Sequence, residues 1–110
     1  MDVVIPTRFD IFLARLDPTI GSEIRKTRPC VVISPDELNM ALNTVVVAPM
    51  TTGGNAYSWR VPVTFDGRSG RVALDQIRAI DRDRLLTKLG VLDAPTTTMV
   101  LDTLAKMFAA

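Results

Sequence analysis

The spacing of apolar residues predicts β-strands along most of this chain. Residues 10–16 and 44–48 are short, mostly apolar runs, and residues 29–33 form a continuous apolar run typical of a central, buried strand. Between residues 59 and 65 every second residue is apolar, which predicts a strand with one buried face and one wet face. This alternation begins at Trp59, which we therefore assign to the core.

Turn signals separate these strands and place two more after them. The segments 17–19 and 34–36 each contain a proline and an aspartate, and they end the first two strands. Residues 66–70 form a glycine-containing turn that leads into short strands at 72–74 and 77–80.

Helix signals are few and mostly lie near the end of the chain. Residues 37–42 suit a short helix, and Asp81 can cap a single helical turn that runs through Arg84. The segment Asp93-Ala94-Pro95 predicts the start of a terminal amphipathic helix. Its apolar residues fall three or four apart: Val100, Leu101, Leu104, Ala105 and Phe108.

Several short strands, one terminal helix and no βαβ repeat predict a mainly β (α+β) fold, a small twisted barrel with the helix packed on it. Pro49 cannot donate a hydrogen bond to a strand ladder. It therefore predicts an edge, bend or bulge just before Thr51, which would re-aim the threonine hydroxyl.

Length and composition indicate one globular domain over residues 1–110. The chain is 47% hydrophobic and 23% charged, and no apolar run reaches the ~18 residues that span a bilayer. Residues 1–6 lack the basic region and long apolar core of an export signal, so we expect a cytoplasmic protein. Cys30 is the only cysteine, which excludes an intrachain disulfide, and its apolar neighbours predict a buried, inert thiol.

The absence of histidine removes several kinds of chemistry at once. The chain contains no histidine, which excludes histidine acid–base catalysis, Ser-His and Cys-His nucleophiles and the commonest zinc ligands. A net charge of +1 argues against a broadly basic surface that wraps a duplex. A nucleic-acid site would then depend on local clustering of charge.

The polar segment from Gly21 to Pro29 is the clearest cluster of charge. It carries Arg25, Lys26 and Arg28 between two strands, and Pro29 biases Arg28 to an extended conformation that aims its guanidinium in a defined direction. A planar cation there suits a phosphate or an oxyanion. A solvated hairpin tip with Glu23 as a surface partner accounts for the same residues equally well.

Other polar positions are ambiguous from the sequence. Asp75 follows a strand end and either faces the same mouth as Glu23 or is a turn residue. Thr51 and Thr52, before two glycines, offer donors to a nucleotide, although turn chemistry explains them equally. Tyr57 is left open as a base-stacking residue. The acidic residues show no metal-ligand spacing and no phosphate-binding glycine loop occurs, so we expect no metal and no cofactor.

Several ordered blocks together resemble one protein family. They are Leu16-Asp17-Pro18-Thr19 with Gly21-Ser22-Glu23, Thr27-Arg28-Pro29 running into Val31-Val32-Ile33-Ser34-Pro35, Val47-Ala48-Pro49-Met50-Thr51, and Leu74-Asp75-Gln76-Ile77-Arg78. With these blocks the chain resembles the MazF/PemK (Kid) toxin endoribonucleases. The resemblance implies an SH3-like barrel, a homodimer and sequence-specific, metal-independent cleavage of single-stranded RNA by the toxin of a type II toxin–antitoxin pair.

The resemblance also implies roles for individual residues. The family's catalytic arginine and threonine fall on Arg28 and Thr51, its glutamate falls on Glu23, and the proposed base of the Kid branch falls on Asp75. The Kid-type arginine and histidine are replaced by Ala73 and Ser22, which favours a mechanism centred on Arg28 and Thr51. Contacts to RNA are expected from Ser22, Arg25, Lys26, Thr52, Asn55 and Gln76.

The implied reaction uses the 2′-hydroxyl of RNA as the nucleophile and gives 2′,3′-cyclic phosphate and 5′-hydroxyl ends, with Glu23 or Asp75 accepting the proton.

The expected partners are RNA, a second copy of the chain and an acidic antitoxin segment that covers Arg28, with any DNA contact made only through an antitoxin complex. For the dimer, Met50 and the terminal helix supply apolar area. A gyrase-binding toxin of the CcdB type, or an SH3-like module that binds RNA or a peptide without cutting, are the alternatives.

Overall fold

The fold is that of a computed structural model, which describes residues 5–110. The expectation about an export signal rests partly on residues 1–4, which lie outside the described residues. The elements are, in chain order, β1 (Asp10–Arg15), β2 (Thr27–Val32), α1 (Asp36–Ala41), β3 (Thr44–Thr51), β4 (Arg60–Phe65), β5 (Arg68–Ala73), η1 (Leu74–Gln76), β6 (Arg78–Asp81), η2 (Arg82–Arg84), β7 (Leu85–Val91) and α2 (Ala94–Met107), where η marks a 3₁₀ turn.

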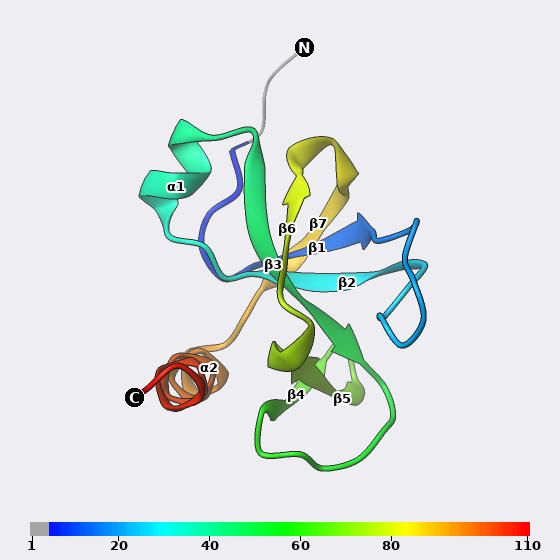
Figure 1. The fold of residues 1–110 in the computed structure, drawn as a ribbon, viewed down its shortest axis with the longest axis vertical. Coiled ribbons are helices and arrows are strands. Elements are labelled where there is room, and N and C mark those ends of the chain that lie inside the picture. The colour runs from blue at the N-terminus through cyan, green and yellow to red at the C-terminus, as the bar shows by residue number, and fades with distance from the viewer. Residues whose placement is uncertain (1–4) are drawn as a thin grey trace.

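The strands form one curled antiparallel sheet (Figure 1). Its order is β4-β5-β3-β2-β1-β7, and β6 pairs with the first half of β3. The sheet curls into a half-barrel, and α2 packs beside β4 while α1 lies at the opposite end of β3 (Figure 1). The predicted mainly β class with a short helix and a terminal helix is confirmed.

Apolar side chains pack on both faces of the curled sheet. Because successive strand residues point to opposite faces, Val31 enters one core with Ile11, and its neighbour Val32 enters the other with Phe12. Both valines are fully buried, as expected of a central strand between β1 and β3. Cys30 is also fully buried, as predicted, and burial raises the pKa of its thiol to about 12, which disfavours the reactive thiolate.

Pro49 lies where β3 changes its partner along one edge. The strand pairs with β6 through Val47 and with β5 from Met50 onward, so Pro49 falls between the two ladders. A residue without an N–H is tolerated at such a gap. At the predicted bend before Thr51, β3 continues as one strand, but its pairing changes from β6 to β5. Thr51 is therefore paired with β5.

One strand was not predicted from the sequence. Strand β7 pairs with β1 along its length, yet most of its residues are exposed and show no alternation of apolar and polar positions. Because apolar and polar residues do not alternate regularly in β7, its pairing with β1 depends on tertiary contacts.

The terminal helix begins where the sequence predicted. The Asp93 carboxylate accepts hydrogen bonds from the Thr96 backbone N–H at 3.1 Å and from the Thr96 hydroxyl, which caps α2. Of its apolar residues only Val100 is fully buried, while Phe108, beyond the helix end, is 70% exposed. No helix within residues 5–110 is long and apolar enough to cross a membrane.

Candidate active site

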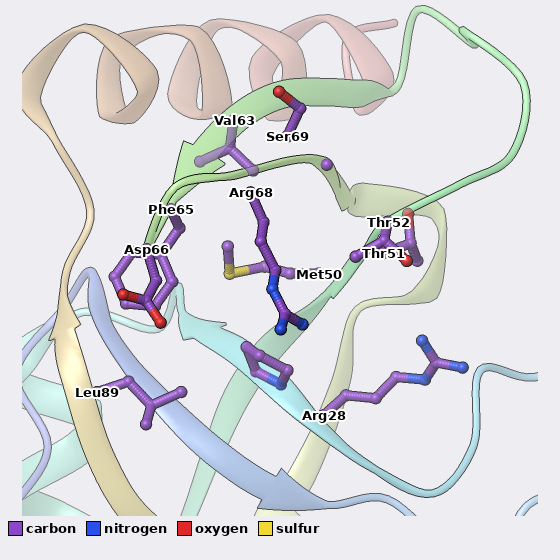
Figure 2. A pocket seen from close by; sticks show the side chains of 12 residues that line it. Arg28, Met50, Thr51, Thr52, Val63, Phe65, Asp66, Arg68, Ser69 and Leu89 are labelled. Atoms are coloured by element: carbon purple, nitrogen blue, oxygen red, sulfur yellow. The ribbon is translucent and has the colours of Figure 1, made fainter.

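A hollow of about 510 Å³ lies where the ends of β2 and β3 meet the β4–β5 hairpin. We call it the Arg28 hollow. Its lining includes Arg28 from β2, Thr51 and Thr52 from the end of β3, and Arg68 from β5. Figure 2 shows the Arg68 side chain reaching from the hairpin into the hollow and Arg28 extending on the side of Thr51 and Thr52. Met50, expected to offer exposed area for a dimer, is instead 9% exposed in this wall.

Arg28 is held by its inner nitrogen and leaves its outer nitrogens available. Its Nε donates to the Arg25 carbonyl oxygen at 2.9 Å, a contact within the β1–β2 loop. Within residues 5–110 the two terminal nitrogens make no hydrogen bond or ion pair. A guanidinium fixed in this way presents a planar pair of donors to an anion in the hollow.

The position of Thr51 is set by a close approach of β5. A Cβ added to Gly70 would lie 2.2 Å from the Thr51 carbonyl oxygen, so only glycine allows β5 to pack this close to β3. The Thr51 hydroxyl donates to the Gly53 carbonyl oxygen at 3.3 Å. The threonine is half-buried and lines the Arg28 hollow.

The two predicted carboxylates lie together in a second hollow of about 310 Å³, lined by Glu23, Asp75 and Gln76 and by Pro49 of β3. We call it the Glu23 hollow. Glu23 Oε1 accepts a hydrogen bond from the Ile20 N–H at 2.8 Å, which folds the loop on itself. Gln76 Oε1 accepts from the Ile24 N–H at 3.3 Å and ties η1 to the same loop. The structure brings Glu23 and Asp75 to one hollow, which does not include Arg28 or Thr51 in its lining.

Asp75 is paired with Arg60. Both of its carboxylate oxygens accept hydrogen bonds from the Arg60 guanidinium, at 2.9 Å each. These hydrogen bonds hold the pKa of Asp75 below its ordinary value and raise that of Arg60. Arg60 is the cross-strand partner of Ala73, the position at which the Kid-type arginine is missing. The cation beside Asp75 therefore comes from β4.

A protein-family model described as the PemK-like, MazF-like toxin of type II toxin–antitoxin systems matches residues 7–108. This chain belongs to that family. Its sequence is 40% identical over 79 residues to the endoribonuclease PemK of Escherichia coli, a match that covers 67% of this chain and 59% of PemK. It is 34% identical over 87 residues to the endoribonuclease toxin MazF of E. coli K12, covering 78% of each chain.

Solved structures of PemK-like, MazF-like toxins share the fold. MazF from Deinococcus radiodurans superimposes with a TM-score of 0.86 at 24% identity, covering 98% of this chain and all of that one. A mycobacterial endoribonuclease in complex with its cognate antitoxin gives a TM-score of 0.78 at 22% identity, covering 92% of each chain. The predicted SH3-like barrel architecture is the one found in this family.

Among the described residues of the Arg28 hollow that the sequence of this PemK-like, MazF-like chain did not identify, Arg68 is the only cation. Arg68 follows the two-residue turn Asp66-Gly67, where both residues have positive φ, and opens β5. Its side chain brings a second guanidinium to the hollow, and it makes no ion pair within residues 5–110. The sequence predicted the turn, but the direction in which the Arg68 side chain points depends on how β5 pairs with β4.

The remaining predicted RNA contacts lie in two loops. Ser22, Arg25 and Lys26 are exposed in the β1–β2 loop, and Thr52 lines the Arg28 hollow. Asn55 lies in the β3–β4 loop, where its amide Nδ2 donates to the Tyr57 hydroxyl at 2.9 Å. Among residues 5–110 no group of three or more histidine, cysteine, aspartate or glutamate side chains gathers as metal ligands would.

The assignment of Trp59 to the core is wrong. Trp59 is 39% exposed, because it precedes β4 and its ring lies against Tyr57 instead of entering the sheet. The apolar alternation is correct from Val61 onward, where Val61 and Val63 are buried.

Proposed function

We propose that this chain is an endoribonuclease that cleaves single-stranded RNA at short sequence motifs, as the toxin of a type II toxin–antitoxin pair. The observation that carries the proposal is the Arg28 hollow, in which two guanidinium groups and two threonines line a space that also has one carboxylate, Asp66, and apolar walls. Membership of a family whose relatives are named endoribonucleases supports the same activity.

The reaction needs little from the protein besides positioning and charge. The 2′-hydroxyl oxygen of the RNA forms a bond to the adjacent phosphorus, and the bond from phosphorus to the 5′-oxygen breaks. The products are a 2′,3′-cyclic phosphate and a 5′-hydroxyl that takes a proton from solvent. No electron transfer occurs and no metal is required.

Arg28 stabilises the extra negative charge of the pentacovalent phosphate, because it lines the hollow and its outer nitrogens have no partner among the described residues. Arg68 holds the same or a neighbouring phosphate from the opposite wall. Thr51 orients a non-bridging oxygen through its hydroxyl, with Thr52 beside it.

Of the two carboxylates in the Glu23 hollow, we assign the 2′-hydroxyl proton to Glu23, which requires the reacting ribose to lie between this hollow and the Arg28 hollow. Its Oε2 carries no hydrogen bond within residues 5–110, whereas both oxygens of Asp75 are occupied by Arg60. A carboxylate whose pKa is lowered by such a pair is a weak base. Asp75 then acts by holding Arg60 and η1 in place.

The remaining assignments follow from this activity. Ser22, Arg25, Lys26, Asn55 and Gln76 bind RNA from the two loops and η1. The antitoxin binds with an acidic segment that covers the Arg28 hollow. Residues 1–110 act as one toxin domain. The protein works in the cytoplasm, where a single reduced cysteine and messenger RNA are both found.

The decisive experiment replaces Arg28. Arg28→Ala should lower the rate of RNA cleavage by at least ~100-fold, the scale for removing one charge-stabilising donor, and should leave the unfolding midpoint nearly unchanged. The matched control is Lys106→Ala, which removes one positive charge from the exposed last turn of α2. Cleavage is followed on a long unstructured RNA with chelator present, and fragment ends are tested for 5′-hydroxyl groups.

Two results would contradict the proposal. Wild-type protein that yields no fragments would favour a binding protein, such as a gyrase-directed toxin or an SH3-like module. A folded Arg28→Ala protein that cuts at the wild-type rate would show that the chemistry lies elsewhere.

A further inference from the structure

Two aromatic rings form an exposed stack in the β3–β4 loop. The rings of Tyr57 and Trp59 lie with their centroids 4.9 Å apart and their planes 7° from parallel. Tyr57 is 41% exposed and Trp59 is 39% exposed. Burial of aromatic rings is strongly favourable, so a stacked pair that is partly open to solvent has flat apolar area that a ligand could cover.

The stack is held in place by hydrogen bonds. The Tyr57 hydroxyl accepts from Asn55, and the Tyr57 backbone N–H donates to the Asn55 carbonyl at 2.9 Å. The Trp59 carbonyl accepts from the Leu74 N–H at 3.2 Å, which joins the loop to η1. The Arg60 guanidinium lies 5.7 Å from the Tyr57 ring centroid while it pairs with Asp75. A platform fixed in this way loses little conformational entropy when it binds.

The stack lies between the two hollows along the chain. The loop that carries it starts directly after Thr51 and Thr52 of the Arg28 hollow. It ends at Arg60, whose partner Asp75 lines the Glu23 hollow. A second arginine, Arg71, donates to the Gly54 carbonyl at 3.1 Å and holds the loop against β5.

We propose that the Tyr57–Trp59 stack is a binding platform for one unpaired base of the RNA. This inference rests on the proposed function, because the loop that carries the stack begins directly after Thr52, which lines the Arg28 hollow where the phosphate is proposed to bind. Every base has a flat face that stacks on an aromatic ring, whereas a paired base is already stacked in its duplex. The platform therefore favours single-stranded over double-stranded RNA.

A protein segment is the other candidate occupant, and the shape of the surface argues against it. The two rings are parallel and about two-fifths exposed, and the flat face of an aromatic ring suits another flat ring better than a branched side chain. Arg71 adds positive charge next to the phosphates that a base brings with it, whereas the charge of Arg60 is balanced by Asp75.

Trp59 is the only tryptophan in the chain, so its fluorescence reports directly on the platform. The probe is a single-stranded 2′-deoxy decamer of randomised sequence, which binds without being cut because it lacks the nucleophile. Its control is a decamer of the same length without bases. We expect the base-bearing decamer to quench Trp59 and the abasic decamer to leave the emission nearly unchanged.

Matched variants separate the ring from its hydroxyl. Tyr57→Ala should weaken binding of the base-bearing decamer by about tenfold to a hundredfold, the range for loss of one stacked base. Tyr57→Phe keeps the ring and should bind within about threefold of wild type. Phe108→Ala removes an exposed aromatic residue past the end of α2 and should have no effect. The slope of binding against salt should be unchanged in Tyr57→Ala, because no phosphate contact is lost.

Equal quenching by the two decamers would overturn the platform, as would wild-type binding by a folded Tyr57→Ala protein. A Tyr57→Ala protein that loses affinity only for the antitoxin would also overturn it. Because the abasic comparison uses wild-type protein, it does not depend on how the variants fold. RNA cleavage by the wild-type protein is scored separately, so quenching without cleavage would contradict the proposed function and leave the platform standing.

Discussion

Arg28 and Asp75 differ in what already occupies their charged atoms. Arg28 uses its Nε–H on the Arg25 carbonyl and keeps two terminal nitrogens, with four N–H donors, for a ligand, whereas both oxygens of Asp75 accept from Arg60. Hydrogen-bonding capacity that is already used within the protein is not available to a substrate. In the proposed mechanism, this difference separates Arg28, which contacts the phosphate, from Asp75, which supports the residues around it.

Exchange of the two carboxylates for amides tests that distinction. Glu23→Gln should slow RNA cleavage by about 10² to 10⁴, the usual contribution of a general base, while Asp75→Asn should keep the rate within about tenfold. The amide oxygen introduced by Glu23→Gln can still accept from the Ile20 N–H, so the loop should keep its shape. Single-turnover cleavage rates and circular dichroism measure both effects, and the reverse pattern would assign the proton to Asp75.

At the scale of single residues, the sequence identified the groups with charge but not all of their partners. Arg28 was located through its proline, and Asp75 through its place after a strand. Arg68 and the partnership of Arg60 with Asp75 depend on which residues of β4 and β5 face each other, and that register is a property of the folded hairpin.

At the scale of elements, the contact between β3 and β5 links stability to the site. Gly70→Ala places a methyl group on the Thr51 carbonyl and should destabilise the fold by roughly 1–3 kcal/mol through overpacking. Because Thr51 must move, cleavage should fall as well. Gly53→Ala is the control, since its Cβ would meet nothing within 4 Å, and it should stay within about 0.5 kcal/mol of wild type in urea unfolding. Equal effects of the two substitutions would contradict this account.

The cap of α2 gives a pH-dependent stability. Hydrogen bonds from Thr96 lower the pKa of Asp93 in the folded chain below its value of about 4 in the unfolded chain. The stabilisation by the Asp93 carboxylate is therefore complete above about pH 4 and is lost as the pH falls through the lower pKa of the folded chain. Asp93→Asn should therefore be less stable than wild type at pH 6, and the gap in unfolding midpoint should narrow toward pH 2. A gap that stays constant with pH would show that the charge contributes nothing.

Among the elements, β7 shows the limit of pattern analysis. Strand β2 was predicted because residues 29–33 form a continuous apolar run, and β4 because its residues alternate between apolar and polar. Strand β7 has mostly exposed residues, and its pairing with β1 contains two register shifts. Its strand conformation comes from an available edge on β1.

At the scale of the whole molecule, apolar area remains uncovered. Leu86 and Val91 of β7 are 50% and 60% exposed, and Met99 of α2 is 48% exposed. Large exposed apolar side chains on two elements are typical of a protein that associates with itself. We therefore expect light scattering to give twice the 12.1 kDa mass of one chain at micromolar concentration. A monomer mass across that range would contradict a homodimer.

The sequence by itself determined the class of fold, most of the strands and the capped terminal helix, and it singled out Arg28 and Thr51, which the structure places in one hollow. These features depend on local spacing, on proline and cap chemistry, and on the resemblance of the ordered blocks to the PemK/MazF family. Only the tertiary structure decided that Arg68 enters the hollow with Arg28, that Arg60 occupies Asp75, and that Trp59 lies on the surface against Tyr57. Each of these depends on strand register and loop closure, which bring together residues from separate parts of the chain and which no local pattern specifies.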